Sequence, residues 1–188
     1  MDRDKVLERL GEFYTYVLPE DIGYEAYVEF LGFITPYWNE AVSVHCNGSG
    51  GETDYAFAIV DLIREHGKVS TYLTGTALSC HSVIFAAGAE RFVSEHGAIG
   101  IHQPYFENST GSADVFQERS NRLEKLKVQI AKIYADASNE ETSWWLDRID
   151  SISDGRFKRY GADMLIHLDF AQPMYDWRKV TEDERSDV

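Results

Sequence analysis

The amino-acid sequence predicts a single α/β domain, spanning residues 1–188, built from repeated strand–helix–strand units. One observation is that a strand-like run, a glycine turn and a helix-like run follow one another twice, over residues 41–65 and 69–87. Parallel strands need such crossovers, so this order indicates a parallel sheet covered by helices. A second observation is size, because 188 residues with 44% hydrophobic content supply one core and are too few for two ordinary domains.

Three segments precede the repeated units. Residues 1–12 are charged throughout, with apolar residues at helical spacing from position 6, and they lack the apolar core of a secretory signal. Residues 13–18 form a short β-rich run that ends at Pro19. The apolar spacing over residues 24–34 predicts a helix. We therefore expect a strand and a helix before the first repeat.

The two repeats and the segment after them supply most of the expected sheet. Each repeat gives a strand, a glycine turn and a helix, at 41–46, 47–51 and 55–65, then at 69–74, 75–77 and 78–87. Short strands are expected at 92–93 and 98–101.

A long helix is predicted from residue 112 to about residue 137. Its apolar residues lie on one side, at Val115, Leu123, Leu126, Ile130 and Ile133, with charged residues opposite. The charged face suits solvent, which is the default, and it would equally suit packing against another subunit. Residues 181–188 form an acidic tail without apolar periodicity, which we expect to be flexible.

Composition excludes several classes of protein. The net charge of −14, from 32 acidic and 18 basic residues, repels phosphate backbones and argues against nucleic-acid binding. No run approaches the ~20 apolar residues of a membrane span. The two cysteines, Cys46 and Cys80, lie in apolar stretches, which predicts buried thiols in a reducing compartment. A soluble, cytoplasmic protein is expected.

Ser79 is a candidate nucleophile, because it follows a glycine turn where the chain passes from strand to helix. The free N–H groups and the dipole of a helix start favour developing negative charge there. An ordinary helix N-cap is the alternative. Ser49–Gly51 is a second candidate anion site, with a simple tight turn as its alternative. Neither segment has the spacing of a nucleotide-binding loop.

His102 is a candidate base, because it stands at the end of a strand-like run, where a side chain can project into a cleft. A structural role is the alternative. His81 is two residues from Ser79, too close in sequence to be the simple choice, although it could perturb the site. The histidines and cysteines lack zinc spacing, so no metal site and no cofactor are predicted.

Four motifs in order resemble the Clp protease proteolytic-subunit family. They are N-G-S-G-G at residues 47–51, G-T-A-L-S at 75–79, A-G-A at 87–89 and G-I-H-Q-P at 100–104. The resemblance covers roughly residues 13–166. It implies a crotonase-like α/β fold with a protruding long helix, and the activity of a serine endopeptidase.

Carried over position by position, the resemblance makes Ser79 the nucleophile and His102 the general base. The backbone N–H groups of Gly51 and Cys80 would form the oxyanion hole, although the family usually has methionine where this chain has Cys80. The third triad member is aligned by matching Ser153 to the family serine that begins the next helix. That alignment selects Asp150 at the cost of one deleted residue, with Asp147 as the alternative.

The resemblance also implies an assembly. Family members form stacked heptameric rings, a tetradecamer, and receive unfolded polypeptides from an AAA+ unfoldase that uses the ATP. Ser43 and His45 replace the usual aromatic residues on the docking strand, while Tyr72 and Phe92 are retained nearby. Residues 1–12 are too few and too charged to resemble the family's pore loop. This divergence and the small size resemble phage-encoded members, which would act in the host cytoplasm.

Two alternative functions remain open from the sequence. A non-catalytic subunit could enter mixed rings with an active Clp subunit and alter docking or gating. An acyl-CoA hydratase or isomerase of the same superfold would use glycine-turn N–H groups to hold a thioester enolate. The serine and histidine in matching motifs favour the peptidase over both.

Overall fold

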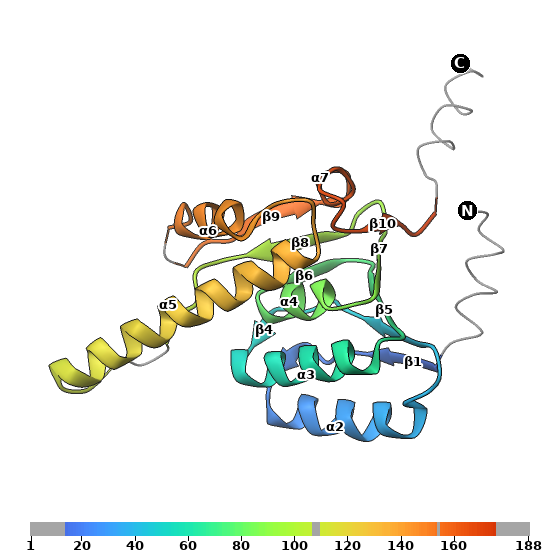
Figure 1. Ribbon diagram of the computed structural model, residues 1–188, viewed down its shortest axis with the longest axis horizontal. Helices are drawn as coiled ribbons and strands as arrows, with labels where there is room; N and C mark the ends of the chain where they lie inside the picture. The colour runs from blue at the N-terminus through green and yellow to red at the C-terminus, as the bar shows by residue number, and fades with distance from the viewer. Residues whose placement is uncertain (1–13, 107–109, 154, 176–188) are drawn as a thin grey trace, which may run out of the picture.

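The central element of the fold is a parallel sheet, as the repeated units predict. The computed structural model describes residues 14–106, 110–153 and 155–175. Five parallel strands lie in the order β1-β3-β5-β7-β10, which are Tyr14–Val17, Val42–His45, Val69–Leu73, Glu90–Val93 and Gln172–Pro173 (Figure 1). Every residue of β5 is buried, as expected for a central strand covered on both faces. The predicted α/β class is confirmed.

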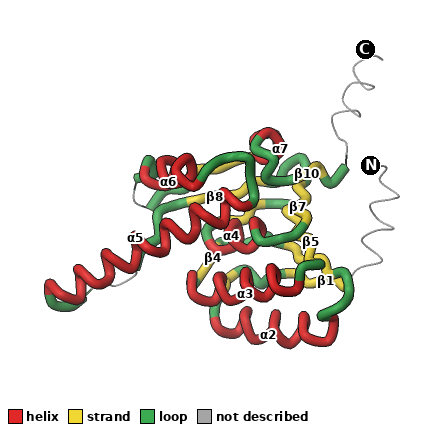
Figure 2. The backbone as a smooth tube through the Cα atoms, viewed as in Figure 1, coloured by secondary structure: helices red, strands yellow, loops and turns green. Residues whose placement is uncertain are grey.

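The helix before the first repeat and the helices of the two repeats each follow a strand. Helix α2 covers Tyr24–Ile34, α3 covers Thr53–His66 and α4 covers Cys80–Ala86. Helices α2 and α3 lie side by side, and α3 and α4 pack against β5 (Figures 1 and 2). Helix α3 ends at Gly67, whose left-handed backbone lets its N–H donate to the carbonyl of Ile63. All three helices were predicted to within a few residues.

A second, three-stranded sheet departs from the prediction. Strand β6 (Thr76–Leu78) pairs in parallel with β8 (Ala98–Ile101), and β8 pairs antiparallel with β9 (Lys158–Gly161). Residues 75–77 were expected to be a turn, so this expectation is wrong for most of the segment. Three residues carry too little periodicity to indicate a strand, and the pairing partner of β6 lies about 20 residues further along the chain.

The glycine segment of the first repeat is also paired. Strand β2 (Asp21–Ile22) pairs in parallel with β4 (Gly50–Gly51). An isolated bridge joins Gly48 to Ala77 of β6. Residues 48–51 therefore lie between β2 and β6, and not in a free turn as expected.

Three further helices belong to the second half of the chain. The predicted long helix is α5 (Ala113–Asp136), which extends away from the body at its N-terminal end (Figure 1). Its buried residues are in the second half, at Leu126, Ala131, Ile133 and Tyr134. Helices α6 (Thr142–Asp150) and α7 (Ala162–His167) and a 3-10 turn (Thr35–Tyr37) were not predicted. No strand or helix in the described residues separates α6 from β9.

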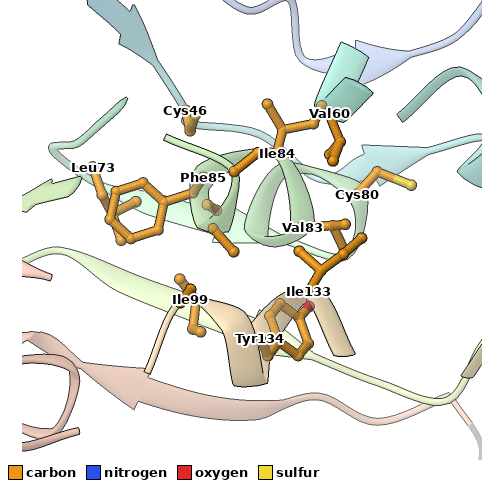
Figure 3. Close-up of a cluster of buried hydrophobic side chains, with 14 of the residues drawn as sticks. Cys46, Val60, Leu73, Cys80, Val83, Ile84, Phe85, Ile99, Ile133 and Tyr134 are labelled. Atoms are coloured by element: carbon orange, nitrogen blue, oxygen red, sulfur yellow. The ribbon is translucent and has the colours of Figure 1, made fainter. Parts of the chain in front are cut away.

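The core gathers around α4, every residue of which is buried. Figure 3 shows Val83, Ile84 and Phe85 of this helix among side chains from the surrounding strands and from α5. Burying one such side chain contributes about 1.5–3 kcal/mol. Both cysteines are free and buried, as predicted. Cys80, the residue after Ser79, is thus buried in the main hydrophobic core.

A stack of three rings begins on β3, the strand that the resemblance assigns to partner docking, and continues across β5 and β7. His45 on β3, Tyr72 on β5 and Phe92 on β7 occupy matching register positions. The rings of His45 and Tyr72 are stacked with centroids 5.2 Å apart, and those of Tyr72 and Phe92 are 5.0 Å apart. Ser43 is fully buried and hydrogen-bonded to Thr15.

The charged segment 1–12 and the acidic tail 181–188 lie outside the described residues. In the parts of the chain that are described, no helix is both long enough and apolar enough to cross a membrane.

Candidate active site

Ser79 and His102 leave the same edge of the second sheet. Strands β6 and β8 are parallel neighbours, with Leu78 paired to Gly100. The N–H of Ser79 donates to the carbonyl of Gly100 at 2.9 Å. Because the carboxyl ends of parallel strands meet at one edge, the residues that follow β6 and β8 are brought together.

The backbone of Ser79 is in a conformation that non-glycine residues rarely adopt, with φ of 51° and ψ of −123°. Such a conformation costs on the order of 1–3 kcal/mol and persists only where the surroundings impose it. A strained serine between a strand and a helix exposes its hydroxyl at the strand edge. This geometry supports Ser79 as a nucleophile and is not that of a simple N-cap, since the Ser79 side chain makes no capping hydrogen bond.

The side chains of Ser79 and His102 are hydrogen-bonded. The distance from Ser79 Oγ to His102 Nε2 is 2.6 Å, and His102 Nδ1 lies 2.7 Å from the backbone carbonyl of Gln103. A carbonyl only accepts, so Nδ1 carries the proton and donates it. Nε2 is then unprotonated and accepts the hydroxyl proton of Ser79. This is the tautomer in which His102 can act as a general base.

The surroundings of His102 favour its neutral form. Burial lowers the pKa of His102 below its ordinary value, and the hydrogen bond to the Gln103 carbonyl opposes this only in part. The rings of Phe157 and Tyr105 lie with centroids 4.8 Å and 5.6 Å from the imidazole. His102 is therefore unprotonated and ready to accept a proton at neutral pH.

Glycine strand β4 lies directly beside Ser79. A β-carbon at Gly50 would lie 2.5 Å from the β-carbon of Ser79 and 2.9 Å from its hydroxyl oxygen. Cys80 is the first residue of α4, where backbone N–H groups have no acceptor within the helix. Of the predicted oxyanion residues, Cys80 directly follows the serine, and Gly51 follows Gly50 and lines the same cleft as Ser79.

The thiol of Cys80 is not a competing nucleophile. Burial raises its pKa to about 11, so it stays protonated at neutral pH, whereas the reactive form of cysteine is the thiolate. The thiol also lies 3.1 Å from the backbone carbonyl of Gly51, to which it donates. The serine hydroxyl is the group of this pair that faces a base.

The carboxylate of Asp150 is not hydrogen-bonded to His102 in this structure. It accepts a hydrogen bond from Lys127 at 2.8 Å, and the Asp150 side chain is 53% exposed. Asp147, the alternative, makes no hydrogen bond to His102 either, both residues being among those described. The sequence alignment took Ser153 as the start of a helix, but the next helix, α7, begins only at Ala162, after β9. The alignment through Ser153 is therefore not supported by the helix boundaries.

The remaining candidates have structural roles. His81 is fully buried, and its Nε2 donates to the carbonyls of Pro19 and Glu20 at 3.0 and 3.2 Å. Burial lowers its pKa, so it stays neutral. Ser49 donates to Asp21 and to the carbonyl of Glu20. Neither side chain is bonded to Ser79 or His102.

A buried hydrogen-bond chain supports the backbone of the nucleophile. The sequence did not predict it. The hydroxyl of Ser82 donates to the carbonyl of Ser79 at 2.6 Å. Its single proton is thereby used, so the hydroxyl of Tyr134, at 2.7 Å, must donate to Ser82. Tyr134 is 1% exposed and belongs to α5. Tyr134 was not among the apolar positions predicted for that helix; its place four residues after Ile130 is a signal that could have indicated burial, but not this bond.

Substitutions in the Tyr134–Ser82–Ser79 hydrogen-bond chain should have unequal effects on stability. Ser82→Ala leaves a buried phenol hydroxyl without an acceptor and should cost about 1–3 kcal/mol, whereas Tyr134→Phe removes one hydrogen bond and should cost about 1 kcal/mol. The double variant should be no less stable than Ser82→Ala alone, because it has no Tyr134 hydroxyl that would be left buried without an acceptor. Urea unfolding of the three variants measures their free energies of unfolding. If the loss in the double variant equals the sum of the two single losses, the proposed hydrogen-bond chain is contradicted.

A cleft of about 640 Å³ opens over the serine–histidine pair. Its apolar lining comes from Tyr105, Phe106, Leu126 and Phe157. An ion pair between Arg122 of α5 and Asp54 of α3 also belongs to the wall. The cleft is large enough for several residues of an extended peptide. In the described part of the chain, no three histidine, cysteine or acidic side chains are grouped as metal ligands would be.

Comparisons with known proteins indicate a family for this chain. A family model described as Clp protease matches residues 25–151. An ATP-dependent Clp protease proteolytic subunit 1 from Chlamydia pneumoniae is 36% identical over 98 residues, or 50% of this chain and 51% of that protein. ATP-dependent Clp protease proteolytic subunits from Oltmannsiellopsis viridis and Bacteroides thetaiotaomicron are 31% and 29% identical, over 63% and 62% of this chain.

The matched regions cover 63% of the O. viridis protein and 53% of the B. thetaiotaomicron protein. The chain therefore spans about half to two thirds of the length of the curated relatives it matches.

Proposed function

Because the chain belongs to the Clp protease family, we propose that it is a serine endopeptidase in which Ser79 is the nucleophile and His102 the general base. The observation that carries this proposal is the 2.6 Å hydrogen bond from the strained Ser79 to the unprotonated nitrogen of a buried, neutral imidazole. A serine with only a structural role does not require an unprotonated imidazole nitrogen beside its hydroxyl. A histidine with only a structural role does not require a serine hydroxyl at its unprotonated nitrogen.

The reaction would proceed by acyl transfer. Ser79 Oγ attacks the carbonyl carbon of a peptide bond while its proton passes to His102 Nε2. The negative charge that develops on the carbonyl oxygen would be stabilised by the N–H groups of Gly51 and Cys80. His102 then gives its proton to the leaving amine, and water, deprotonated by His102, hydrolyses the acyl-enzyme. These steps need no cofactor.

The proposed assembly is a stack of heptameric rings of this single peptidase domain. The exposed first half of α5 supports it, because a charged helix that extends from the body offers a surface to a neighbouring copy. Polypeptides would be supplied by an AAA+ unfoldase in the cytoplasm, or in a host cytoplasm for a phage-encoded chain. The stacked rings of His45, Tyr72 and Phe92 would lie on the docking strand, where Ser43 and His45 would alter partner choice.

A fluorophosphonate probe tests the proposal directly. The assembled protein should be labelled at Ser79, as located by peptide mapping, and should hydrolyse short fluorogenic peptides. Heat-unfolded protein is the control, since labelling depends on the folded site. An assembled ring that is neither labelled nor active would instead indicate a non-catalytic subunit that joins mixed rings with another Clp subunit.

A further inference from the structure

We propose that the backbone carbonyl of Gln103, in place of a carboxylate, orients His102, and that the Gln103 side chain is the positioning group that holds this carbonyl. The inference rests on the proposed peptidase function and specifies how its base is held. In a serine–histidine–aspartate triad, the carboxylate accepts the second ring N–H and keeps the correct tautomer. Here that N–H, on Nδ1, donates to the Gln103 carbonyl at 2.7 Å.

The Gln103 side chain is anchored to the end of α6. Its Nε2 donates to the carbonyl of Ile152 at 2.9 Å and to that of Asp150 at 3.3 Å. These bonds join the segment after β8 to a part of the chain almost 50 residues away. The backbone of Gln103 can therefore not rotate freely, and its carbonyl stays directed at the imidazole.

The aspartate that could replace this carbonyl is engaged elsewhere. Asp150 is paired with Lys127, which is also 2.7 Å from Glu124 on the same helix. Moving the Asp150 carboxylate toward His102 would remove one of the two acidic partners of the Lys127 ammonium.

An aromatic ring occupies the position across from His102. Lys158 of β9 pairs with Ile101 of β8, so the preceding residue, Phe157, lies opposite the following residue, His102. The two rings meet edge to face with centroids 4.8 Å apart. A carboxylate approaching from β9 would have to displace this ring.

The chemical consequence concerns the protonated base. When the Ser79 proton moves to Nε2, the imidazole becomes a cation with N–H groups on both nitrogens. A carbonyl dipole still accepts from Nδ1 but supplies no full negative charge, so it stabilises the cation less than a carboxylate would. The acid limb of the kcat/KM profile should accordingly lie below pH ~6.5, the ordinary pKa of histidine, because His102 loses activity only once the falling pH protonates it.

Three variants of the assembled full chain test the inference. Gln103→Ala should lower kcat by about 10- to 100-fold with little change in KM, as expected when a catalytic group is misplaced by about 1 Å. Its acid limb should move to still lower pH, because the carbonyl bond that favours protonated His102 is weakened. Gln117 is an exposed glutamine of α5, so Gln117→Ala is the matched control. It should leave both kcat and the pH of the acid limb unchanged.

Asp150→Asn should keep kcat within about threefold of the unsubstituted chain, like Asp136→Asn, which removes a comparable exposed ion pair with Arg64. A loss near the 10,000-fold that follows removal of a triad carboxylate would overturn the inference. So would such a loss in Asp154→Asn, a position outside the described residues, or an acid limb above pH ~6.5.

These outcomes are separable from failure of the proposed function. An unsubstituted chain that neither reacts with a fluorophosphonate nor cleaves peptide contradicts the peptidase assignment itself, and with it the role of Gln103. A chain that reacts at Ser79, yet depends on Asp150 or Asp154, remains a peptidase and contradicts only the role of Gln103. Thermal midpoints and ring size, measured on every variant, separate misplacement of His102 from unfolding.

Discussion

Ser79→Ala lowers kcat for a short fluorogenic peptide by at least about 10,000-fold, which is the expected result if the hydroxyl forms the acyl-enzyme. Alanine has no atom that can attack the carbonyl carbon, so only the oxyanion donors and the cleft remain to accelerate the reaction. The fold should be retained, because the backbone bonds from Ser79 to Gly100 and Ser82 do not involve the side chain. Steady-state kinetics with thermal unfolding and sedimentation measure both effects.

Ser49→Ala is the matched control for this variant. Ser49 lines the same cleft, but its hydroxyl donates to Asp21 and Glu20 and not to a base. It should change kcat by less than about tenfold, as a surface hydrogen bond worth ~1 kcal/mol allows. The assignment of the nucleophile is contradicted if Ser79→Ala keeps an assembled, active enzyme, or if both variants lose activity equally.

Gly51→Ala should destabilise the fold by about 3 kcal/mol or more and abolish peptide hydrolysis. The backbone of Gly51 has φ of +139°, which side-chain-bearing residues rarely adopt. A β-carbon there would lie 2.2 Å from the carbonyl oxygen of Ile22 and 2.6 Å from its nitrogen. These are backbone atoms, so strands β2 and β4 must separate to admit it. Urea unfolding of the variant measures the loss.

Gly67→Ala provides the comparison that isolates the clash. Gly67 also has a positive φ, of 72°, but a β-carbon there would meet nothing within 4 Å. Gly67→Ala should therefore lower the free energy of unfolding by only about 1–2 kcal/mol, the cost of a left-handed backbone for alanine, and leave kcat unchanged. If both glycine variants lose the same free energy of unfolding, the close packing of β4 against β2 is not the reason that position 51 requires glycine.

Periodicity predicted the elements that are long enough to repeat. The helix expected over 24–34 has the same bounds as α2, and the helix expected over 112–137 is α5 at 113–136. Each has enough turns for its apolar side to be recognised. The short strands β2, β6 and β10 have two or three residues, and their pairing partners lie far along the chain. Their existence depends on those partners and not on local residue preference.

The sequence by itself determined the family and predicted the pair Ser79 and His102, because both residues stand in motifs that resemble those of the Clp proteolytic subunits. Only the tertiary structure decided what holds the base. The register of β9 against β8 decides which residue lies opposite His102, and a register shift of one residue turns a side chain to the opposite face. With Lys158 opposite Ile101, the ring of Phe157 and the carbonyl of Gln103 meet the imidazole, and the carboxylate of Asp150 meets Lys127.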